Sequence, residues 1–366
     1  MRIRLTTAQA EHLGLTVKEK KNDGNGHPKY SISDAQFQKL QEFKLGVIKT
    51  QSETDNIPLN DVKHLWHKTA EASYFITNPL YKAEETESFF DRIKSVISES
   101  ERKYPEIKRT AIKDGHLLVI NPADIHLGKL ASAFETGEDY NVNIAVQRVK
   151  DGVQGIIDKS AGFNIDKIIF VGGNDVLHID TPKGTTTAGT FQNTDGMWYD
   201  NFMKAFKLYV EVLEMLIPVA DVHFVYCPSN HDYTNGFFLC QTVEQYFRQN
   251  ENITFDCSIA HRKYFVYGLN LLGFSHGDGG KEANLPLSMA HEAKDWSICK
   301  HRYIYVHHLH HKVAKDYMSV CVETMRSPSG TDSWHHRNQY ANNIKAVEGF
   351  MHHKEFGQIA RFNHIF

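Results

Sequence analysis

The sequence predicts an α/β fold for most of this 366-residue chain. From about residue 112 onward, apolar segments of strand length alternate with amphipathic helical segments, and several of the apolar segments run directly into a polar cluster. This alternation is typical of α/β proteins, in which strands deliver functional side chains at their carboxyl ends. Because the chain is longer than one compact core usually needs, we expect a large domain at residues 112–366 and a smaller N-terminal one at residues 1–111.

The composition indicates a globular protein and argues against several other classes. Hydrophobic residues make up 41% of the chain and charged residues 23%, which is ordinary for a globular domain. The start has no apolar core of signal-peptide length, and no apolar run approaches a membrane span. The five cysteines are scattered, as expected for reduced thiols in a cytoplasmic protein without membrane contact. The net charge of −3 supplies no overall positive field for non-specific nucleic-acid binding.

Residues 1–111 are predicted to form a mainly helical extension. Two capping-box patterns predict short helices that begin near Thr7 and Asp34. A longer helix is expected from Glu84 to about Arg102, and Pro105 ends it. Short helices of mixed charge are a weak signal for a DNA-reading helix-turn-helix. We therefore favour an appendage that packs on the large domain or mediates homo-oligomer formation.

The large domain has predicted elements throughout its length. The segment at 142–159 places Val146, Val149, Val153 and Ile157 on one side, which predicts an amphipathic helix. The other assignments rest on apolar runs of strand length and on a second long helical segment. The predicted strands lie at 117–120, 167–171, 222–227, 264–267, 269–274, 303–306 and 359–362, and the helices at 142–159 and 197–217.

Polar clusters follow five of these strands. They are Asp124-Ile125-His126, Asp175 after two glycines, Asn230-His231-Asp232, His276, and the pentamer His307-His308-Leu309-His310-His311. In an extended segment, residues i and i+2 point the same way, so Asp124 and His126 could meet one cation. A turn aspartate or a lone histidine is more often structural, whereas a histidine-rich pentamer favours metal binding. Each signal is weak to moderate alone, but their joint occurrence at strand ends predicts a site.

The order of these clusters resembles the calcineurin-like metallophosphoesterase superfamily, whose motifs run D-x-H, G-D-x-x-[DH], G-N-H-[DE], H and G-H-x-H. The resemblance covers about residues 115–315 and implies a four-layer α/β/β/α sandwich that reaches Phe366. It also implies two divalent metal ions and a ligand set: Asp124, His126 and His310 at the first ion, Asp175 bridging both, and Asn230, His276 and His308 at the second. His231 would be the general acid, oriented by Asp232.

Three positions depart from the family pattern. Asn174, Ser229 and His307 stand where glycine is usual. Because all three are backbone-turn positions rather than ligands, we expect an altered loop geometry and an intact site.

The implied chemistry suits these residue types. Two cations can clamp a phosphate and generate hydroxide near neutral pH, and the hydroxide attacks phosphorus while His231 protonates the leaving oxygen. Nitrogen and oxygen ligands without thiolate favour manganese, with magnesium, iron or zinc as alternatives. The sequence therefore predicts a metal-dependent phosphoric ester hydrolase.

A second resemblance narrows the range of candidate substrates. Asp175-Val176-Leu177-His178 looks like the D-x-[FL]-H of the branch that contains the DNA double-strand-break-repair nucleases, in which the histidine assists at the phosphodiester. It is equally possible that His178 is a partly buried histidine in the turn with no catalytic role. Asp180 is a second candidate for the last position of this motif. The Thr/Gly loop at 184–190, expected to border the site, and the segment at 329–337 look like those of phage-encoded DNA repair exonuclease-like members.

Three functions remain open at this stage. The first is a phosphodiesterase or nuclease that acts on nucleic acid or oligonucleotides, with phosphate contacts and base stacking from Arg326, Arg337, Lys312, Lys315, Trp334 or Trp198. The second is a phosphatase or diesterase for small nucleotides or phosphoproteins. The third, remote alternative is a catalytically silent scaffold.

Overall fold

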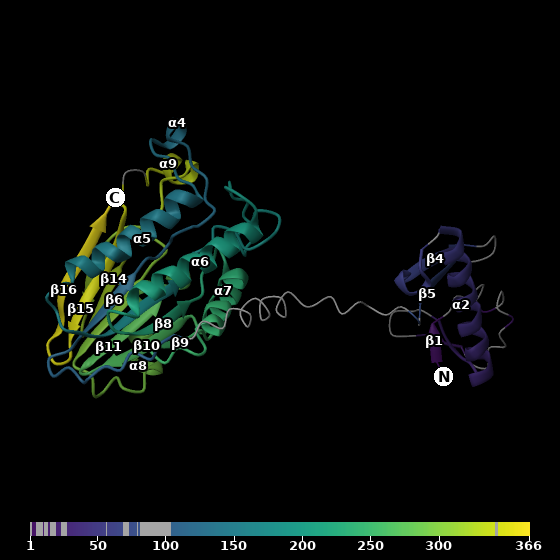
Figure 1. Ribbon diagram of the computed structural model, residues 1–366, viewed down its shortest axis with the longest axis horizontal. Helices are drawn as coiled ribbons and strands as arrows, with labels where there is room; N and C mark the ends of the chain where they lie inside the picture. The colour runs from purple at the N-terminus through teal and green to yellow at the C-terminus, as the bar shows by residue number, and fades with distance from the viewer. Residues whose placement is uncertain are drawn as a thin grey trace. The chain divides into compact units, whose positions relative to one another are not determined.

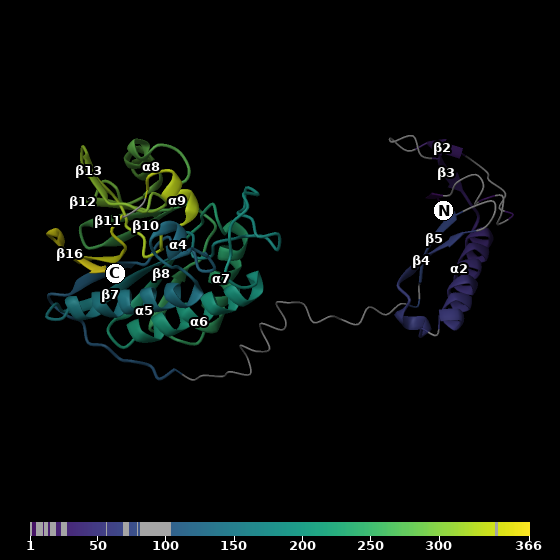
Figure 2. The ribbon, with the colours of Figure 1, turned by 90° about the horizontal axis from the view of Figure 1, so that it is seen from above.

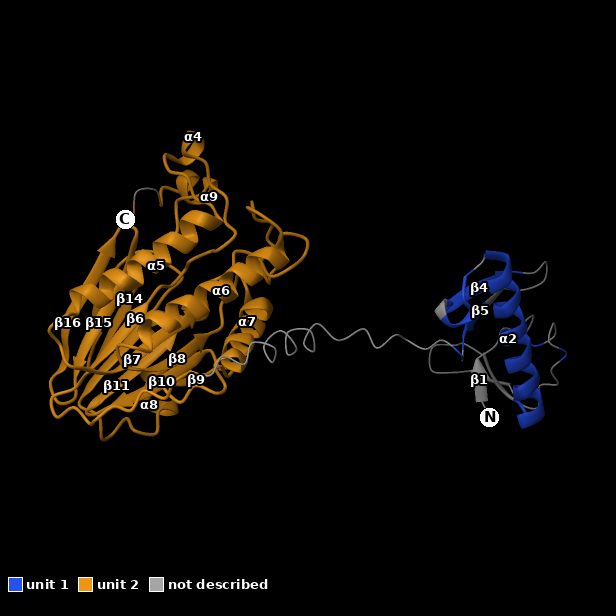
Figure 3. Cartoon of the chain, viewed as in Figure 1, with its two compact units in different colours: residues 1–95 blue, residues 96–366 orange. Residues whose placement is uncertain are grey.

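The computed structural model describes residues 2–4, 10, 14, 20–22, 28–55, 57–68, 73–78, 80, 104–340 and 343–366. The chain divides into two compact units, residues 1–95 and 96–366, which Figure 3 colours separately. Within the described residues, no helix is both long enough and apolar enough to span a bilayer.

The N-terminal unit contains one long helix, α2 (Asp34–Asp55), and several short strands. The predicted helix start at Asp34 is confirmed with its capping box, since the Ser33 N–H donates to Oε1 of Gln36 at 2.8 Å and the Gln36 N–H donates to Oγ of Ser33 at 3.3 Å. The predicted length is wrong, because the helix has 22 residues and is not short. The short strands are β1 (Arg2–Arg4), β2 (Lys20–Asn22), β3 (Pro28–Ser31), β4 (His64–Lys68) and β5 (Ser73–Thr77), with a 3-10 turn η1 (Leu59–Asp61). These strands, of three to five residues, were not predicted, because they are too short to establish a periodicity. The helices predicted near Thr7 and from Glu84 to Arg102 lie outside the described residues.

The second unit is built around a six-stranded sheet. Its order is β16-β15-β6-β7-β8-β9. Strands β6 to β9 are parallel, and β15 runs antiparallel to both β6 and β16. The bounds are β6 (His116–Asn121), β7 (Ile165–Gly173), β8 (Asp221–Cys227), β9 (Ile253–Asp256), β15 (Ala346–His353) and β16 (Gly357–Ile365).

A five-stranded sheet of order β10-β11-β12-β14-β13 accompanies it. The three central strands are parallel, and each edge strand pairs antiparallel with its neighbour. The bounds are β10 (Arg262–Tyr267), β11 (Asn270–Ser275), β12 (His301–Val306), β13 (Val313–Tyr317) and β14 (Val320–Thr324).

Helices cover the outer face of each sheet, so the second unit is a four-layer α/β/β/α sandwich, as predicted. Figure 2 shows α5 (Val142–Lys159) and α6 (Trp198–Leu216) on one side of the two sheets and α8 (Leu285–Glu292) on the other. Helix α7 (Tyr233–Tyr246) packs beside α6, and a 3-10 turn η2 (Glu282–Asn284) leads into α8. Along β6 the side chains alternate, because Leu118 and Ile120 join the α5–α7 core while Leu117 and Val119 join the core between the sheets.

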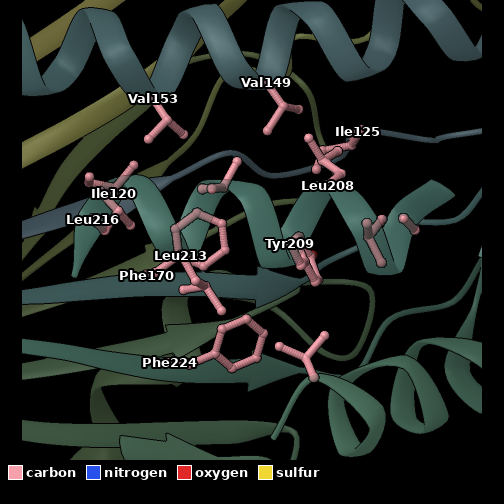
Figure 4. Close-up of a cluster of buried hydrophobic side chains, with 14 of the residues drawn as sticks. Ile120, Ile125, Val149, Val153, Phe170, Leu208, Tyr209, Leu213, Leu216 and Phe224 are labelled. Carbon is pink, nitrogen blue, oxygen red and sulfur yellow. The ribbon is translucent and has the colours of Figure 1, made fainter. Parts of the chain in front are cut away.

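The largest apolar core lies between the six-stranded sheet and its helices, and Figure 4 shows part of it. The Phe170 ring lies 5.7 Å from the Tyr209 ring, edge to face, and 5.8 Å from the Phe224 ring. Such pairs add about 0.5–1.5 kcal/mol to the burial of the rings themselves. The strands of the sheet pack on this core and carry the loops at their carboxyl ends (Figure 1).

The predicted elements of the second unit agree closely with those observed. Helix α5 has the predicted bounds, and α6 differs by one residue at each end. All seven predicted strands correspond to observed ones: β6, β7, β8, β10, β11, β12 and β16. The prediction missed α7, α8, β9, β13, β14 and β15, and also the short helices at 133–136 and 333–337.

Candidate metal centre and active-site cavity

All five polar clusters follow strands whose carboxyl ends lie at one edge of the sandwich. Asp124 and His126 come after β6, Asp175 after β7, Asn230 and His231 after β8, His276 after β11, and His308 and His310 after β12. Within each sheet these strands are parallel, so their loops leave from the same end. Side chains more than 180 residues apart in sequence therefore meet, as the contact of His126 with His310 shows.

The backbone at these clusters adopts the left-handed region. Among the described residues, eight non-glycine residues have positive φ, and six of them belong to the site: Asp124 (51°), His126 (48°), Asn174 (54°), Asp175 (57°), His308 (71°) and His310 (56°). Such φ values cost roughly 1–2 kcal/mol each and gather where function requires them. The expectation that an extended segment points Asp124 and His126 the same way is wrong, since both residues have left-handed backbone rather than extended backbone.

A first group of ligand atoms comes from Asp124, His126 and His310. Nε2 of His126 lies 3.2 Å from Nε2 of His310, which lies 3.5 Å from Oδ1 of Asp124. Burial lowers the pKa of both imidazoles, so each is neutral and offers a lone pair. Burial acts to raise the pKa of Asp124, but His310 beside it outweighs that effect and lowers it.

A second group comes from Asp175, His276 and His308, with Asn230 beside it. Nε2 of His276 lies 3.2 Å from Oδ2 of Asp175 and 2.9 Å from Oδ1 of Asn230. Burial acts to lower the pKa of His276, but the Asp175 carboxylate outweighs it and raises that pKa to about 9. Oδ2 of Asp175 also lies 4.0 Å from Nε2 of His126, so this carboxylate stands between the two groups.

Both groups fit divalent cations. The carboxylate of Asp175 and the amide oxygen of Asn230 can only accept, and both face one nitrogen of His276. In the first group, two imidazole nitrogens face each other beside a second carboxylate. A cation among these atoms would displace the proton that the raised pKa places on His276 and would accept the lone pairs of all its neighbours. The donors are oxygen and imidazole nitrogen without thiolate, which suits manganese, iron, zinc or magnesium.

His231 and His178 lie beside the first group. Nδ1 of His231 lies 3.0 Å from the carbonyl oxygen of His178, and because a carbonyl only accepts, Nδ1 carries the proton. Nε2 of His231 is thus left for the cavity that this residue lines. The two rings stack at 5.4 Å, and Nδ1 of His178 lies 3.4 Å from Nδ1 of His126. The structure therefore brings both predicted histidines to the site.

Asp232 does not orient His231, and this prediction is wrong. Its Oδ1 accepts from the Ser229 hydroxyl at 2.7 Å, and its Oδ2 accepts from the Leu177 N–H at 2.8 Å. The carbonyl of His178 takes the expected role instead. Burial, and then the nearby Asp175, raises the pKa of Asp232 to about 8. Asp232 joins the loop after β7 to the loop after β8 from beneath the site.

Two sequence alternatives are resolved by their contacts. Asp180 accepts the backbone N–H groups of Thr234 at 3.1 Å and Asn235 at 2.7 Å, so it caps the start of α7 rather than serving the centre. Within the pentamer, His307 is buried against the carbonyl of Ser275, and His311 bonds the carbonyl of Leu309. Of the pentamer, only His308 and His310 belong to the two ligand groups.

The two groups open into a cavity of about 720 Å³. The Thr/Gly loop contributes Thr186, Ala188 and Thr190 to its wall, which confirms the expectation that this loop borders the site. A second wall comes from the short helix α9 (Ser333–Arg337), which packs near the single-turn helix α4 (Ala133–Thr136).

The residues suggested for nucleic-acid contact divide into two sets. Trp334 and Arg337 line the cavity. Arg326 instead pairs with buried Glu348 at 2.7 Å, and the cavity lining does not include Lys312, Lys315 or Trp198. The positions of these four residues do not support the prediction that they contact the substrate.

Sequence reasoning missed Lys129. Its side chain is 1% exposed and lines the cavity, and its Nζ bonds the carbonyl of Gly330 at 3.2 Å and Oδ2 of Asp332 at 3.0 Å. The one available signal was its position three residues after His126, which does not by itself mark a functional lysine.

Comparison with known proteins finds similarity among solved structures. No protein-family model and no curated protein matches the sequence. An archaeal phosphodiesterase is 10% identical, with a TM-score of 0.34 over 69% of this chain and 99% of that one. Zinc-complexed Vps29 from Entamoeba histolytica is 11% identical, with a TM-score of 0.30 over 68% and 98%. A predicted phosphoesterase from Streptococcus pneumoniae is 11% identical, with a TM-score of 0.28 over 69% and 100%.

Proposed function

We propose that this chain is a metal-dependent phosphoesterase that holds two divalent cations and cleaves phosphodiester bonds in nucleic acid or oligonucleotides. The observation that carries the proposal is the position of Asp175 between two converging ligand groups at one cavity. A carboxylate shared by two cations is the arrangement that two-metal hydrolysis requires.

The first cation would be held by Asp124, His126 and His310, and the second by Asn230, His276 and His308, with Asp175 between them. Such a pair supplies charge neutralisation for the phosphate and lowers the pKa of a water that becomes the nucleophile. Manganese is the metal we expect, with magnesium, iron or zinc as alternatives.

The protein's own acid would be His231. The His178 carbonyl holds the proton on Nδ1 and fixes the ring, which leaves Nε2 to give a proton to the departing oxygen once the imidazole is protonated. The stacked ring of His178 limits rotation of His231 and, since it lines the same cavity, could meet the phosphodiester directly.

The size of the cavity favours a diester over a monoester. A volume of about 720 Å³ is within the range of sites that enclose a drug-sized organic ligand, and it far exceeds what one phosphate group needs. A diester carries organic groups on both sides of phosphorus, and the two walls of the cavity could contact both. A nucleotide phosphatase with the same metals is the second candidate, supported by the absence of a net positive charge.

Hydrolysis of two aryl esters tests the proposal. Protein stripped with a chelator and supplied with manganese should cleave bis(4-nitrophenyl) phosphate, and Asp175→Asn should not. Cleavage of 4-nitrophenyl phosphate alone would replace the diesterase by the phosphatase. If two ions bind per chain and neither ester is cleaved, the hydrolase proposal is wrong for these substrates and the scaffold takes its place.

A further inference from the structure

An exposed aromatic pair stands in the wall of the active-site cavity. The rings of Trp334 and Tyr340 stack with centroids 5.8 Å apart and planes 21° apart. Their side chains are nevertheless 62% and 50% exposed, and both line the cavity that contains the two ligand groups. A stacked pair with its outer surface open to a phosphate-binding cavity offers a flat apolar platform to whatever is attached to the phosphate.

Partly buried contacts connect this platform to the candidate metal centre. Oδ1 of Asp332 accepts from the backbone N–H of His335 at 2.9 Å and lies 2.7 Å from Nδ1 of the same residue, which caps α9. Oδ2 of Asp332 lies 3.0 Å from the ammonium of Lys129, whose side chain is 1% exposed. The platform therefore depends on an ion pair that reaches the loop carrying His126.

A second contact links the platform to the first ligand group. The ring of His335 stacks on that of His310 at 5.2 Å with 17° between the planes, and the ring of Trp334 lies 5.1 Å from that of His335. Only one imidazole thus separates the platform from a proposed ligand. A group bound on the platform would lie close to a phosphate at the cations.

The polar groups around the platform suit a nucleotide. Arg337, on the same helix turn, lines the cavity and has no ion-pair partner among the described residues. A guanidinium in this position can bind a neighbouring phosphate or stack on a base. Gln192 and Asn193 line the cavity too, and side chains of this type can bond the edges of bases.

We infer that Trp334 and Tyr340 form a nucleobase-binding subsite and that the substrate carries an unpaired base next to the scissile phosphodiester. The inference rests on the proposed function and specifies its substrate class. An aromatic platform needs access to the face of a base, which is covered in a duplex and open in a single strand. Single-stranded ends and short oligonucleotides are therefore the preferred substrates.

Two esters that differ only in the nucleoside isolate this subsite. Thymidine 5′-(4-nitrophenyl phosphate) carries a base, and methyl 4-nitrophenyl phosphate does not. Stacking contributes about 1–3 kcal/mol per base, so Trp334→Ala should lower kcat/KM for the thymidine ester by about 5- to 150-fold, mainly through KM. The methyl ester should change by less than about twofold, and Trp334→Phe should recover most of the loss.

The matched control is Trp66→Ala, which removes a tryptophan that is 65% exposed in the N-terminal unit. This substitution should leave the ratio of kcat/KM for the thymidine ester to kcat/KM for the methyl ester unchanged. An equal loss on both esters in Trp334→Ala, or no loss on either, would overturn the subsite while leaving the phosphoesterase standing.

If wild-type protein cleaves neither ester, the proposed function fails, and binding then tests the subsite separately. Thymidine 5′-monophosphate, titrated with and without manganese, should quench tryptophan fluorescence with saturation, and Trp334→Ala should remove the saturable component. A quench that is absent, or equal in the variant, would overturn the subsite.

Discussion

The hydroxyl of Ser229 accepts the backbone N–H of Asp175 at a distance of 2.7 Å. The same hydroxyl donates to the carboxylate of Asp232, also at 2.7 Å, so a single side chain joins the two loops that carry the proposed bridging ligand and the proposed acid. Glycine at this position would have no side chain to make either bond. Ser229 therefore supports the left-handed turn at Asp175.

Removing that support should weaken the site. Ser229→Ala leaves the buried N–H of Asp175 without its partner, which costs about 1–3 kcal/mol of stability. Metal affinity should fall roughly 10- to 100-fold, as for other groups that hold a ligand in place. Manganese titration by calorimetry measures the affinity, and thermal unfolding measures the stability. Ser160→Ala, a buried serine that bonds the carbonyl of Ile157 in α5, should lower stability without changing the affinity.

Asp175→Asn should abolish hydrolysis and reduce metal content. The substitution keeps the shape of the side chain but removes the charge between the two ligand groups, so two cations would repel each other without compensation. Elemental analysis of the reconstituted protein should give fewer than two ions per chain. Asp180→Asn is the matched control, because it changes a buried carboxylate that caps α7, and it should retain both ions.

His231→Asn should separate binding from catalysis. The imidazole bonds a backbone carbonyl through Nδ1 and is assigned no cation, so both ions should remain. The rate should fall by about 10²–10⁴-fold, as expected when a general acid is lost. Steady-state kinetics combined with elemental analysis checks both parts. A loss of metal in this variant with full occupancy in Asp175→Asn would reverse the two assignments.

Stability should depend on the core beneath the six-stranded sheet. Phe170 is fully buried against Tyr209 and Phe224, so Phe170→Ala should destabilise the protein by about 3–5 kcal/mol. Urea unfolding monitored by circular dichroism measures this loss. Phe191→Ala removes a ring that is 70% exposed and should change the unfolding free energy by less than about 0.5 kcal/mol.

Acid should destabilise the fold through His352. Burial lowers the pKa of this imidazole to about 3, so the folded protein keeps it neutral while the unfolded chain protonates near pH 6.5. The unfolded state then binds more protons, and stability is complete above pH 6.5 and falls as the pH drops toward 3. Between these pH values the free energy of unfolding falls by up to about 1.4 kcal/mol for each pH unit. His352→Gln should flatten the dependence of the urea midpoint between pH 7 and 5, and an unchanged slope would exclude His352 as its source.

The sequence was informative wherever a signal is local. The helix at 142–159 was predicted with its observed bounds, because its apolar residues repeat at helical spacing over eighteen positions. The strand at 346–353 was missed, because it is buried on both sides and its Gly-Phe-Met-His-His end has no alternation to detect. The ligand residues were found because each follows a strand in a recognisable order.

Contacts between distant segments could not be predicted in the same way. Lys129 and Asp332 are far apart in sequence, and neither residue type indicates a buried ion pair. The partner of Asp232 was also wrong, because adjacency in sequence suggested His231 while the fold supplied Ser229 and Leu177. The turn at Asp124 likewise depends on other loops, because its N–H donates to the carbonyl of Asn174 and its carbonyl accepts from the hydroxyl of Ser327. Such geometry belongs to the assembled sandwich rather than to any segment.

The position of β6 has a consequence for how the protein is made. This strand is the first of its sheet in sequence, and it lies between β7 and β15. The residues of β15 are synthesised more than two hundred positions after those of β6. During translation one side of β6 stays without its partner until the C-terminal hairpin emerges, and an open strand edge is a template for aggregation. We therefore expect folding to be slow, with a late step in which β15 and β16 close the sheet. Chaperones that shield open strand edges should therefore raise the yield of folded protein.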